Sequence, residues 1–463
     1  MPSVFKIAFM EPTPDHWSSR TGFILATVGS AVGIGSIWKF PYEVGANGGS
    51  AFVVLYLLGL VFIVIPLMLA EFAIGRRGGG DTVSSIAKVA IQHGASHRWT
   101  LAGWLGVLTG FLILSFYSVI GGWTIAYAVD TLINGLRGGN VEESRARFES
   151  FLASPWQITA YHAAFMIATA AIVARGISHG IEKAMTVLMP VLGALLLALA
   201  AYSMLKGDVW ATLEFLFSID LQKFTFNAAL EALGLGFFSI GVGMGLMITY
   251  AAYSGREISL VSVALISVAG DTAISLLAGF TVFPIVFANG LDPASGPGLV
   301  FVTLPIAFAH MPFGSAAAAA FFALLFVAAL ASAISMLEVV VAMLAPRLHW
   351  TRPRIASIAA LACFAAGLAT ALSFNLLANW HPLSGIAGFG TATLFDILDH
   401  ATSNLLLPLG GLAISLFAGW AIPADMIRDE LGLSPGMALA LRGSLRYLVP
   451  AAILMATLAP LFA

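Results

Sequence analysis

Ionisable side chains inside long apolar stretches are the residues of this sequence best suited to chemistry. Asp271 lies between Val-Ala-Gly and Thr-Ala-Ile-Ser, deep in an apolar segment. A charge at such a depth in a membrane costs about 2.5–3.5 kcal/mol, so a carboxylate there requires a cation or a proton, and we favour a cation. Glu71 and Glu338 lie nearer the ends of their segments, where a solvated carboxylate is the alternative.

Two glycine-rich breaks in apolar segments offer the oxygen ligands that a small hard cation prefers. The first is Gly-Ser-Ala-Val-Gly-Ile-Gly-Ser over residues 29–36, and the second is Ser-Ile-Gly-Val-Gly-Met-Gly over residues 239–245. Each such glycine costs a helix about 0.5–1 kcal/mol relative to alanine. The glycines let the helix unwind where its backbone lines a buried cavity, although a small-residue packing face is the simpler alternative.

These breaks supply groups for both halves of a zwitterion. Helix N-termini exposed at the breaks favour an anionic group such as a carboxylate. The oxygen ligands for a cation are the hydroxyls of Ser36, Ser239 and Ser332 and the freed carbonyls of Gly29 and Val32. Together these groups predict a site for a zwitterion and a sodium ion.

The composition places both breaks in an all-α polytopic membrane protein. Of the 463 residues, 59% are hydrophobic and only 10% are charged, whereas soluble chains carry about 25% charged residues. The net charge of −2 argues against nucleic acid as a partner, and the single cysteine excludes a disulfide framework. The glycines at 241–245 follow no strand and form no phosphate loop. With no catalytic cluster either, we expect neither an enzyme nor a cofactor.

Eleven apolar segments are long enough to cross a bilayer. They cover residues 20–43, 50–75, 102–133, 157–174, 183–205, 226–253, 258–288, 313–346, 354–373, 391–420 and 438–462. The excess of lysine and arginine in alternate loops predicts a cytoplasmic N-terminus in the inner cell membrane. The outward loop 289–312 has an apolar middle, which predicts a hairpin that dips into a vestibule.

The position of the two breaks predicts two related halves. Paired glycine-interrupted spans are typical of a binding site in an inverted-repeat transporter. We expect a cytoplasmic segment over 1–19, five-helix repeats over 20–205 and 226–420, and an eleventh helix over 438–463, all in one structural domain.

Several segments strongly resemble the signature of the neurotransmitter:sodium symporters, in the order that this family has them. They are Trp17-Ser-Ser-Arg20-Thr-Gly-Phe-Ile-Leu-Ala, Gly29-Ser-Ala-Val-Gly-Ile-Gly-Ser36, Lys39-Phe-Pro-Tyr42, Glu43-Val-Gly-Ala-Asn47-Gly-Gly49, Ile248-Thr-Tyr-Ala-Ala-Tyr253, Ala278-Gly-Phe-Thr-Val-Phe-Pro284 and Ala329-Leu-Ala-Ser332-Ala-Ile-Ser335. The resemblance implies a five-plus-five inverted-repeat fold with discontinuous first and sixth helices and one extra helix. Eleven spans are similar to the shorter bacterial members.

The resemblance also implies a role for each matching residue. The substrate would contact Ala31, Gly33, Ile34, Gly35, Ile113, Tyr117, Phe238, Ser239, Gly241, Met244, Ser332 and Met336. Sodium site 1 would comprise Ala31, Ser36, Ser239 and Asp271, and sodium site 2 would comprise Gly29, Val32, Ala328 and Ser332. Lys39 and Asp399 would form an outer gate, Trp17 and Tyr253 would close the inner path, and Glu71 would brace the unwound sixth span.

Some positions depart from the family pattern. Ser36 and Asp271 stand where the family usually has asparagine, and Lys39 stands where it has arginine. Ala331 replaces a hydroxyl residue at sodium site 2. Pro14 and Pro346 occupy the positions of an inner arginine–aspartate gate, so we expect that ion pair to be absent.

The resulting hypothesis is a sodium-coupled symporter in the lipid bilayer that imports a neutral, apolar amino acid, branched or aromatic. The fixed charge of Asp271 would make chloride dispensable. Ser36 and Ala331 favour the alternative, the same fold with proton-coupled or ion-independent transport. A substrate sensor without transport and a channel are further alternatives, and the oligomeric state is left open.

Overall fold

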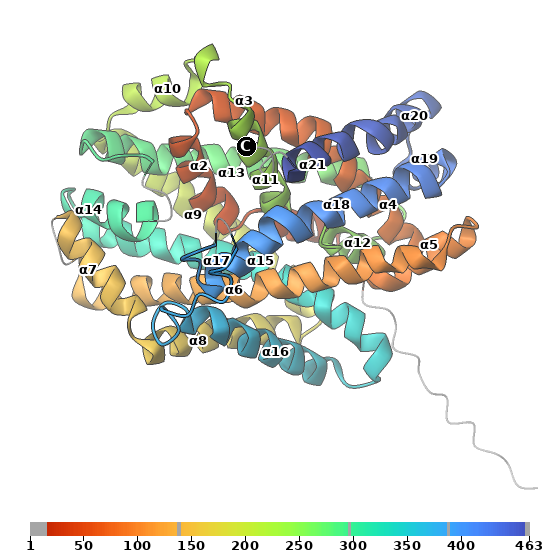
Figure 1. The fold of residues 1–463 in the computed structure, drawn as a ribbon, viewed down its shortest axis with the longest axis horizontal. Helices are drawn as coiled ribbons and strands as arrows, with labels where there is room; N and C mark the ends of the chain where they lie inside the picture. The colour runs from red at the N-terminus through yellow and green to blue at the C-terminus, as the bar shows by residue number, and fades with distance from the viewer. Residues whose placement is uncertain (1–15, 137–139, 295–297, 387–388, 459–463) are drawn as a thin grey trace, which may run out of the picture.

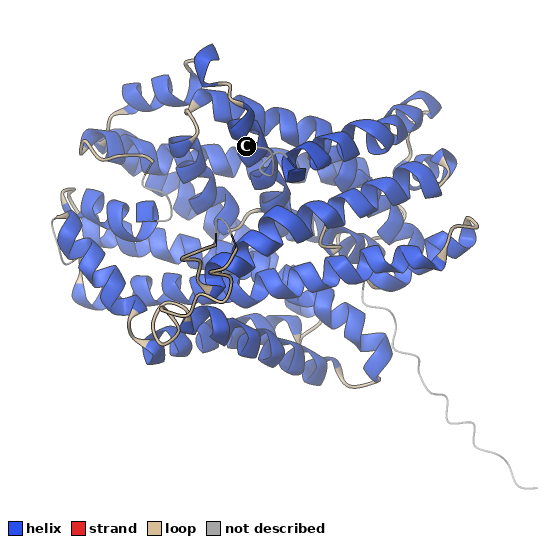
Figure 2. Ribbon diagram, in the orientation of Figure 1, coloured by secondary structure: helices blue, strands red, loops and turns tan. Residues whose placement is uncertain are grey.

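We analysed a computed structural model, which describes residues 16–136, 140–294, 298–386 and 389–458. These residues are helical or lie in turns and loops, and none of them forms a strand (Figure 2). Residues 1–15 of the expected N-terminal segment, which include Pro14, and residues 459–463 of the last expected helix lie outside the described ranges.

Nine helices in the described part of the chain are long and apolar enough to cross a membrane, and a tenth span results if one bent pair is counted. The nine run over Ser50–Gly78, His97–Asn134, Pro155–Val173, Ile177–Lys206, Leu260–Ala288, Gly314–Leu348, Arg352–Leu372, Leu394–Ala421 and Pro435–Leu458. Each lies where the apolar pattern predicts a span.

The bent pair is the expected first span. Helix α1 (Arg20–Ala31) ends at Val32, which has an extended backbone, and the chain resumes as a π-helical turn (Gly35–Lys39) and α2 (Phe40–Ala46). The two halves meet at 50°.

The expected sixth span is also broken. Helix α11 (Phe226–Ile240) is separated from α12 (Leu246–Ala252) by five residues. Gly241, Gly243 and Gly245 have φ values of +74°, +90° and +75°, a left-handed conformation that side chains other than hydrogen disfavour. Counting α11 and α12 as one interrupted span gives the predicted eleven.

The helices pack around these two breaks (Figure 1). The long helices α6 (Thr100–Asn134) and α15 (Gly314–Leu348) pack along each other, with α8 (Pro155–Val173) and α16 (Arg352–Leu372) beside them. Helix α1 packs against α9 (Lys183–Lys206), α13 (Leu260–Ala288) and α15, while α4 (Ile65–Gly78) packs against α12 and α11 contacts α3 (Ser50–Gly59). The unwound backbone therefore lies inside protein, which is the condition for irregular backbone at membrane depth.

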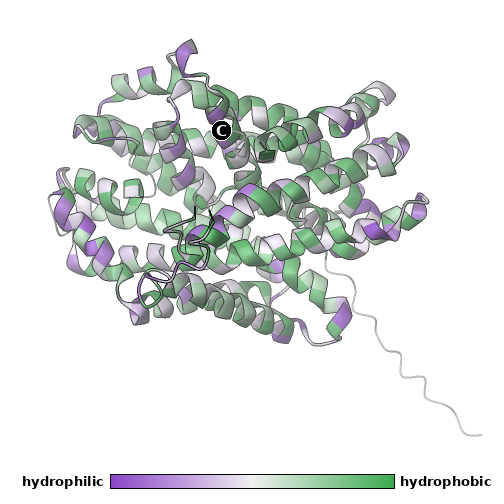
Figure 3. Ribbon diagram, in the orientation of Figure 1, coloured by the Kyte–Doolittle hydropathy of each residue, from purple (hydrophilic) through white to green (hydrophobic). Residues whose placement is uncertain are grey.

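Short helices and polar residues cover the two ends of the bundle. Hydrophilic residues gather at both ends of the long helices and apolar residues dominate between them (Figure 3). Helices α7 (Val141–Leu152), α10 (Val209–Phe217) and α14 (Leu304–Ala309) lie at one end, and α5 (Thr82–Gln92), α19 (Ala424–Leu431) and α20 (Pro435–Gly443) lie at the other (Figure 1). The remaining C-terminal elements are α17 (Leu394–His400), α18 (Leu407–Leu416) and α21 (Val449–Leu458).

The predicted hairpin in 289–312 is present as a buried helical segment. Residues Leu299–Thr303 form a π-helical turn that continues into α14, and Leu299, Val300 and Leu304 are fully buried. The Phe301 ring makes edge-to-face contacts with the rings of Trp38 and Trp123. The segment thus packs against the first span rather than hanging outside as a linker.

Candidate functional site

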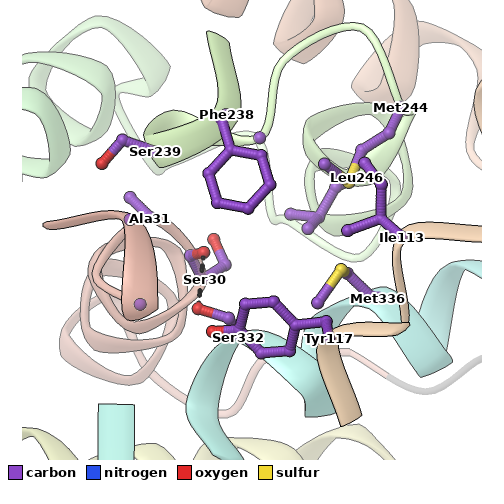
Figure 4. A pocket seen from close by; sticks show the side chains of 13 residues that line it. Ser30, Ala31, Ile113, Tyr117, Phe238, Ser239, Met244, Leu246, Ser332 and Met336 are labelled. Atoms are coloured by element: carbon purple, nitrogen blue, oxygen red, sulfur yellow. Dashed lines mark hydrogen bonds between the residues drawn. The ribbon is translucent and has the colours of Figure 1, made fainter. Parts of the chain in front are cut away.

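The two breaks lie directly against each other. A Cβ added to Gly35 would lie 3.2 Å from the Phe238 ring and 3.4 Å from the Ser239 Cα, so glycine allows this close approach. Between the breaks is a small hollow. It is lined by Ser30, Ala31, Gly33, Gly35, Ile113, Tyr117, Phe238, Ser239, Gly241, Met244, Leu246, Ser332 and Met336. Nearly all substrate-contact residues expected from the sequence therefore line one cavity (Figure 4).

One wall of the hollow presents hydrogen-bond donors from the first break. The backbone N–H of Ile34 donates to the Tyr117 hydroxyl at 3.2 Å. A Cβ on Gly33 would lie 2.8 Å from that hydroxyl and 2.5 Å from the Ser332 Oγ, so only glycine fits there. The Tyr117 hydroxyl keeps a proton that it can donate, so this wall suits a carboxylate.

A polar cluster around Asp271 joins three different helices. The Ser36 hydroxyl donates to Asp271 Oδ1 at 2.5 Å, and the Ser239 hydroxyl donates to the same oxygen at 2.8 Å. The two hydroxyl oxygens are 3.0 Å apart, and Ser36 Oγ lies 3.5 Å from the Ala31 carbonyl oxygen. The structure thus brings together the four residues expected at sodium site 1.

The charge of Asp271 has no cationic partner in the described part of the chain. Its side chain is fully buried, and none of the ion pairs found among the described residues includes it. The Tyr56 hydroxyl donates to Asp271 Oδ2 at 2.8 Å. Neutral hydroxyls stabilise a carboxylate only in part, so the cluster is suited to a cation bound among its oxygens.

The second oxygen cluster is centred on Ser332 of α15. Its hydroxyl donates to the carbonyl oxygens of Ser30 at 3.3 Å and Val32 at 3.4 Å. Gly29 on α1 and Ala328 on α15 are both buried, and they are close in sequence to Val32 and Ser332. Ser332 and Val32 are therefore brought together as expected for sodium site 2, and the ligand role of Gly29 and Ala328 stays a prediction.

The opposite side of the hollow is apolar. Figure 4 shows Ile113, Met244, Leu246 and Met336 grouped beside the Phe238 ring, away from Ser30 and Ser332. A Cβ at Gly241 would lie 3.6 Å from the Met244 Cε, so the glycine leaves space for an apolar group at the break. Flexible methionine side chains can adjust to ligands of different size.

The unwound backbone between α11 and α12 is held from two sides. The N–H of Gly243 donates to Glu71 Oε1 at 2.6 Å, and Glu71 is fully buried. The Thr82 hydroxyl donates to the Gly245 carbonyl oxygen at 2.7 Å. Glu71 therefore braces this break as expected, and the solvated alternative for Glu71 is wrong.

A larger outer cavity lies next to the hollow. Tyr117 and Phe238 line both cavities, so their rings separate them. Lys39 and Asp399 both line the outer cavity, but they are not among the ion pairs of the described residues. The Lys39 ammonium lies 5.0 Å from the centroid of the Phe238 ring, and Asp399 accepts a hydrogen bond from Ser403. The Lys39–Asp399 ion pair is therefore absent from this conformation, and its role as an outer gate stays a prediction.

Trp17, which would close the inner path, is bonded to the end of the broken sixth span. The Trp17 indole N–H donates to the Tyr250 carbonyl oxygen at 2.9 Å, and the Trp17 backbone N–H donates to the Tyr253 carbonyl oxygen. The Tyr253 hydroxyl donates to Glu338, which also binds Arg352. Glu338 is fully buried, so its solvated alternative is wrong as well.

Several residues that contribute to the site were not predicted from the sequence. Tyr56 lies in an apolar span and resembles a packing aromatic. Ser30 lies within the first break but was given no role, and Leu246 directly follows the second break. Thr82 opens a helix outside the spans and reaches back to a break. For Tyr56, the available signal was a phenol in an otherwise aliphatic span, since a buried hydroxyl usually has a partner.

Comparisons with known proteins find relatives over most of the chain. The model of the sodium:neurotransmitter symporter family matches residues 14–147 and 145–459. An uncharacterised sodium-dependent transporter of Bacillus subtilis is 37% identical over 91% of this chain and 90% of its own length. An uncharacterised sodium-dependent transporter of Haemophilus influenzae is 33% identical over 90% of this chain and 91% of its own length.

A solved structure is also similar. The crystal structure of MhsT in complex with L-phenylalanine has a TM-score of 0.88 and 41% identity, covering 96% of this chain and all of that one. The predicted all-α inverted-repeat transporter fold is thereby confirmed, as is the assignment to a multi-pass membrane protein.

Proposed function

Because the chain belongs to the sodium:neurotransmitter symporter family, we propose that it imports a neutral, apolar amino acid together with sodium by alternating access. The family supports sodium-coupled symport, whereas the class of amino acid is proposed from the side chains that line the hollow. The observation that carries it is the Ser36–Asp271–Ser239 cluster beside a hollow whose walls are polar on one side and apolar on the other.

The polar wall would hold the common part of an amino acid. Its carboxylate would meet the backbone N–H groups around Gly33, Ile34 and Gly35 and the Tyr117 hydroxyl, and its ammonium would face the carbonyl of Ala31 and the break at Phe238–Ser239. A carboxylate seated there would lie beside the Asp271 cluster and would complete the first sodium site. Substrate and ion would then share ligands, which couples their binding.

The apolar wall supports a branched or aromatic side chain. Ile113, Phe238, Met244 and Met336 would surround it, and Gly241 adds space at the break. MhsT, whose structure contains L-phenylalanine, is consistent with this class of substrate. We expect charged amino acids to be rejected, because this wall offers no counter-charge.

The described conformation fits one step of the transport cycle. The path past Trp17 is closed, whereas an outer cavity reaches the Tyr117 and Phe238 rings. With the N-terminus in the cytoplasm, an amino acid would enter from outside through this cavity. Inward release would require the first and sixth spans to move against the rest of the bundle.

Proton coupling is the second candidate. Three hydroxyls, from Ser36, Ser239 and Tyr56, already surround the Asp271 carboxyl at hydrogen-bond distance. A hydroxyl oxygen can also accept a hydrogen bond from a carboxylic acid, so a protonated Asp271 would fit this cluster. The absence of a hydroxyl at Ala331 points in the same direction.

One experiment separates these candidates. We would measure the thermal stability of the purified protein with each of the twenty amino acids, in sodium and in potassium. Stabilisation by large apolar amino acids in sodium only is expected, since a ligand that binds only the folded state stabilises it. Uptake into proteoliposomes driven by a proton gradient, with no response to sodium, would contradict the proposal and favour the second candidate.

A further inference from the structure

The N-terminal end of the first span is attached to the fifth span by one carboxylate. Glu182 ends the π-helical turn Ile177–Glu182, directly before α9, and only 4% of its surface is exposed. It accepts hydrogen bonds from the Ser18 backbone N–H at 2.7 Å, the Ser18 hydroxyl at 2.8 Å and the Ser19 hydroxyl at 2.7 Å. Hydrogen bonds to an ionised acceptor are the strongest that neutral donors make.

The surroundings of Glu182 are shaped to receive this carboxylate. A Cβ on Gly22 would lie 1.9 Å from Glu182 Oε1, so a side chain at that position would displace the carboxylate. Ser19 is the N-cap of α1, and its hydroxyl accepts from the Gly22 N–H. The carboxylate therefore lies against the first turn of α1, where the helix dipole favours a negative charge.

The attached segment contains the residue that closes the inner path. Trp17 immediately precedes Ser18, and its two N–H groups donate to the carbonyl oxygens of Tyr250 and Tyr253. Moving the Trp17 backbone N–H away from the Tyr253 carbonyl displaces the adjoining Ser18 as well. Release of Ser18 and Ser19 would leave a nearly buried carboxylate with fewer donors, which is costly unless water enters.

From this geometry we propose that Glu182 is a positioning residue of the inner gate, which acts through Ser18 and Ser19 to hold Trp17 closed. The proposal rests on the transport cycle proposed above, because only a protein that alternates between two states needs hydrogen bonds that hold one of them closed. Opening inward would replace the serine donors by water at Glu182. The residue thereby sets how often the inner path opens.

The test uses a cysteine reporter on the inner path. Cys363 is the only cysteine of the sequence, so Cys363→Ala gives a thiol-free background. In that background Ser335→Cys places a thiol beside Tyr250, whose hydroxyl donates to Ser335. The rate of labelling by a water-soluble maleimide, in sodium and without any amino acid, then reports how often the path is open.

We expect Glu182→Ala to label faster than the parent. The loss of one hydrogen bond to a charged group is worth about a tenfold change in an equilibrium, so the rate should rise about tenfold or more. Glu182→Gln keeps an acceptor oxygen and should restore an intermediate rate. Ser18→Ala with Ser19→Ala should behave like Glu182→Ala, and this pair serves as the test if the glutamate variant does not fold.

The matched control is Asp429→Ala, which removes an exposed carboxylate from the end of the bundle where α19 lies. It should label at the parental rate. Labelling of folded Glu182→Ala and of the serine pair at the parental rate would overturn the proposal. Amino-acid binding by the parent is measured separately, so a failure of the proposed function would appear there and not in the labelling rates.

Discussion

Replacing Asp271 by asparagine tests the chemistry of the proposed sodium site most directly. The substitution keeps the shape of the side chain and removes only its charge. The hydroxyls of Ser36 and Ser239 can still donate to the amide oxygen, and the Tyr56 hydroxyl oxygen can accept from the amide nitrogen. The polar cluster therefore remains bonded, and any change in sodium binding reports the charge.

The size of the effect follows from the position of the carboxylate. Two unit charges about 4 Å apart attract each other by about 4 kcal/mol at the effective dielectric constant of protein sites. The asparagine dipole recovers part of this attraction, so we expect a loss of about 2–4 kcal/mol, or roughly thirtyfold to a thousandfold in sodium affinity. Without sodium the variant should be more stable than the parent, because a buried charge has been removed.

The assay is thermal unfolding of the purified protein over a range of sodium concentrations at constant ionic strength. A ligand at a hundred times its dissociation constant stabilises the folded state by about 2.7 kcal/mol, and this gain should largely vanish in Asp271→Asn. Ser267→Ala is the matched control, since Ser267 lies about one turn away on α13, is equally buried and has no hydrogen-bond partner for its hydroxyl among the described residues. An unchanged half-saturating sodium concentration in Asp271→Asn would refute the assignment.

Three further substitutions probe the walls of the site. Tyr117→Phe should lower amino-acid affinity by about tenfold, because it removes the hydroxyl that binds Ile34 N–H, but it should not weaken binding of the matching decarboxylated amine. Gly243→Ala should reduce thermal stability by at least about 1–2 kcal/mol, because the φ of Gly243 is +90°. The control Gly193→Ala, which has open space at the Cβ position, should not reduce it. Equal melting temperatures of the two variants would contradict this prediction. Glu71→Ala should cost about 1–3 kcal/mol by leaving the Gly243 N–H without its acceptor, measured as lost thermal stability together with weaker substrate binding.

The breaks and the position of Asp271 could be predicted from sequence because both violate a strong physical rule. Gly241, Gly243 and Gly245 are expensive in a membrane helix unless the chain leaves the helix, and all three adopt the left-handed conformation. A carboxylate deep in an apolar span must find polar partners, and Asp271 finds three hydroxyls. Violations of this kind leave few alternative structures.

The partners that complete the site were not predictable in the same way. Tyr56, Thr82 and Glu182 obey the local rules of their own segments, so nothing in their neighbourhood marks them as unusual. Their roles arise from packing between helices far apart in sequence, with a separation of 215 positions from Tyr56 to Asp271 and of 164 positions from Ser18 to Glu182. The expected Lys39–Asp399 pair is not among the ion pairs of the described residues, although both side chains line the outer cavity.

The arrangement of the Asp271 cluster explains why sodium would act on the transport cycle and not on affinity alone. Ser36 follows the first break, Ser239 precedes the second, and Asp271 belongs to the unbroken helix α13. A cation among these oxygens therefore favours the conformations in which both breaks approach α13. A ligand shifts an equilibrium only by its difference in affinity for the two states, and couplings of this kind are about 1–3 kcal/mol. Because Trp17 directly precedes the segment that enters α1, a cation that fixes the first break also favours the closed position of Trp17. Before sodium binds, Glu182 sets how strongly the protein prefers this closed position.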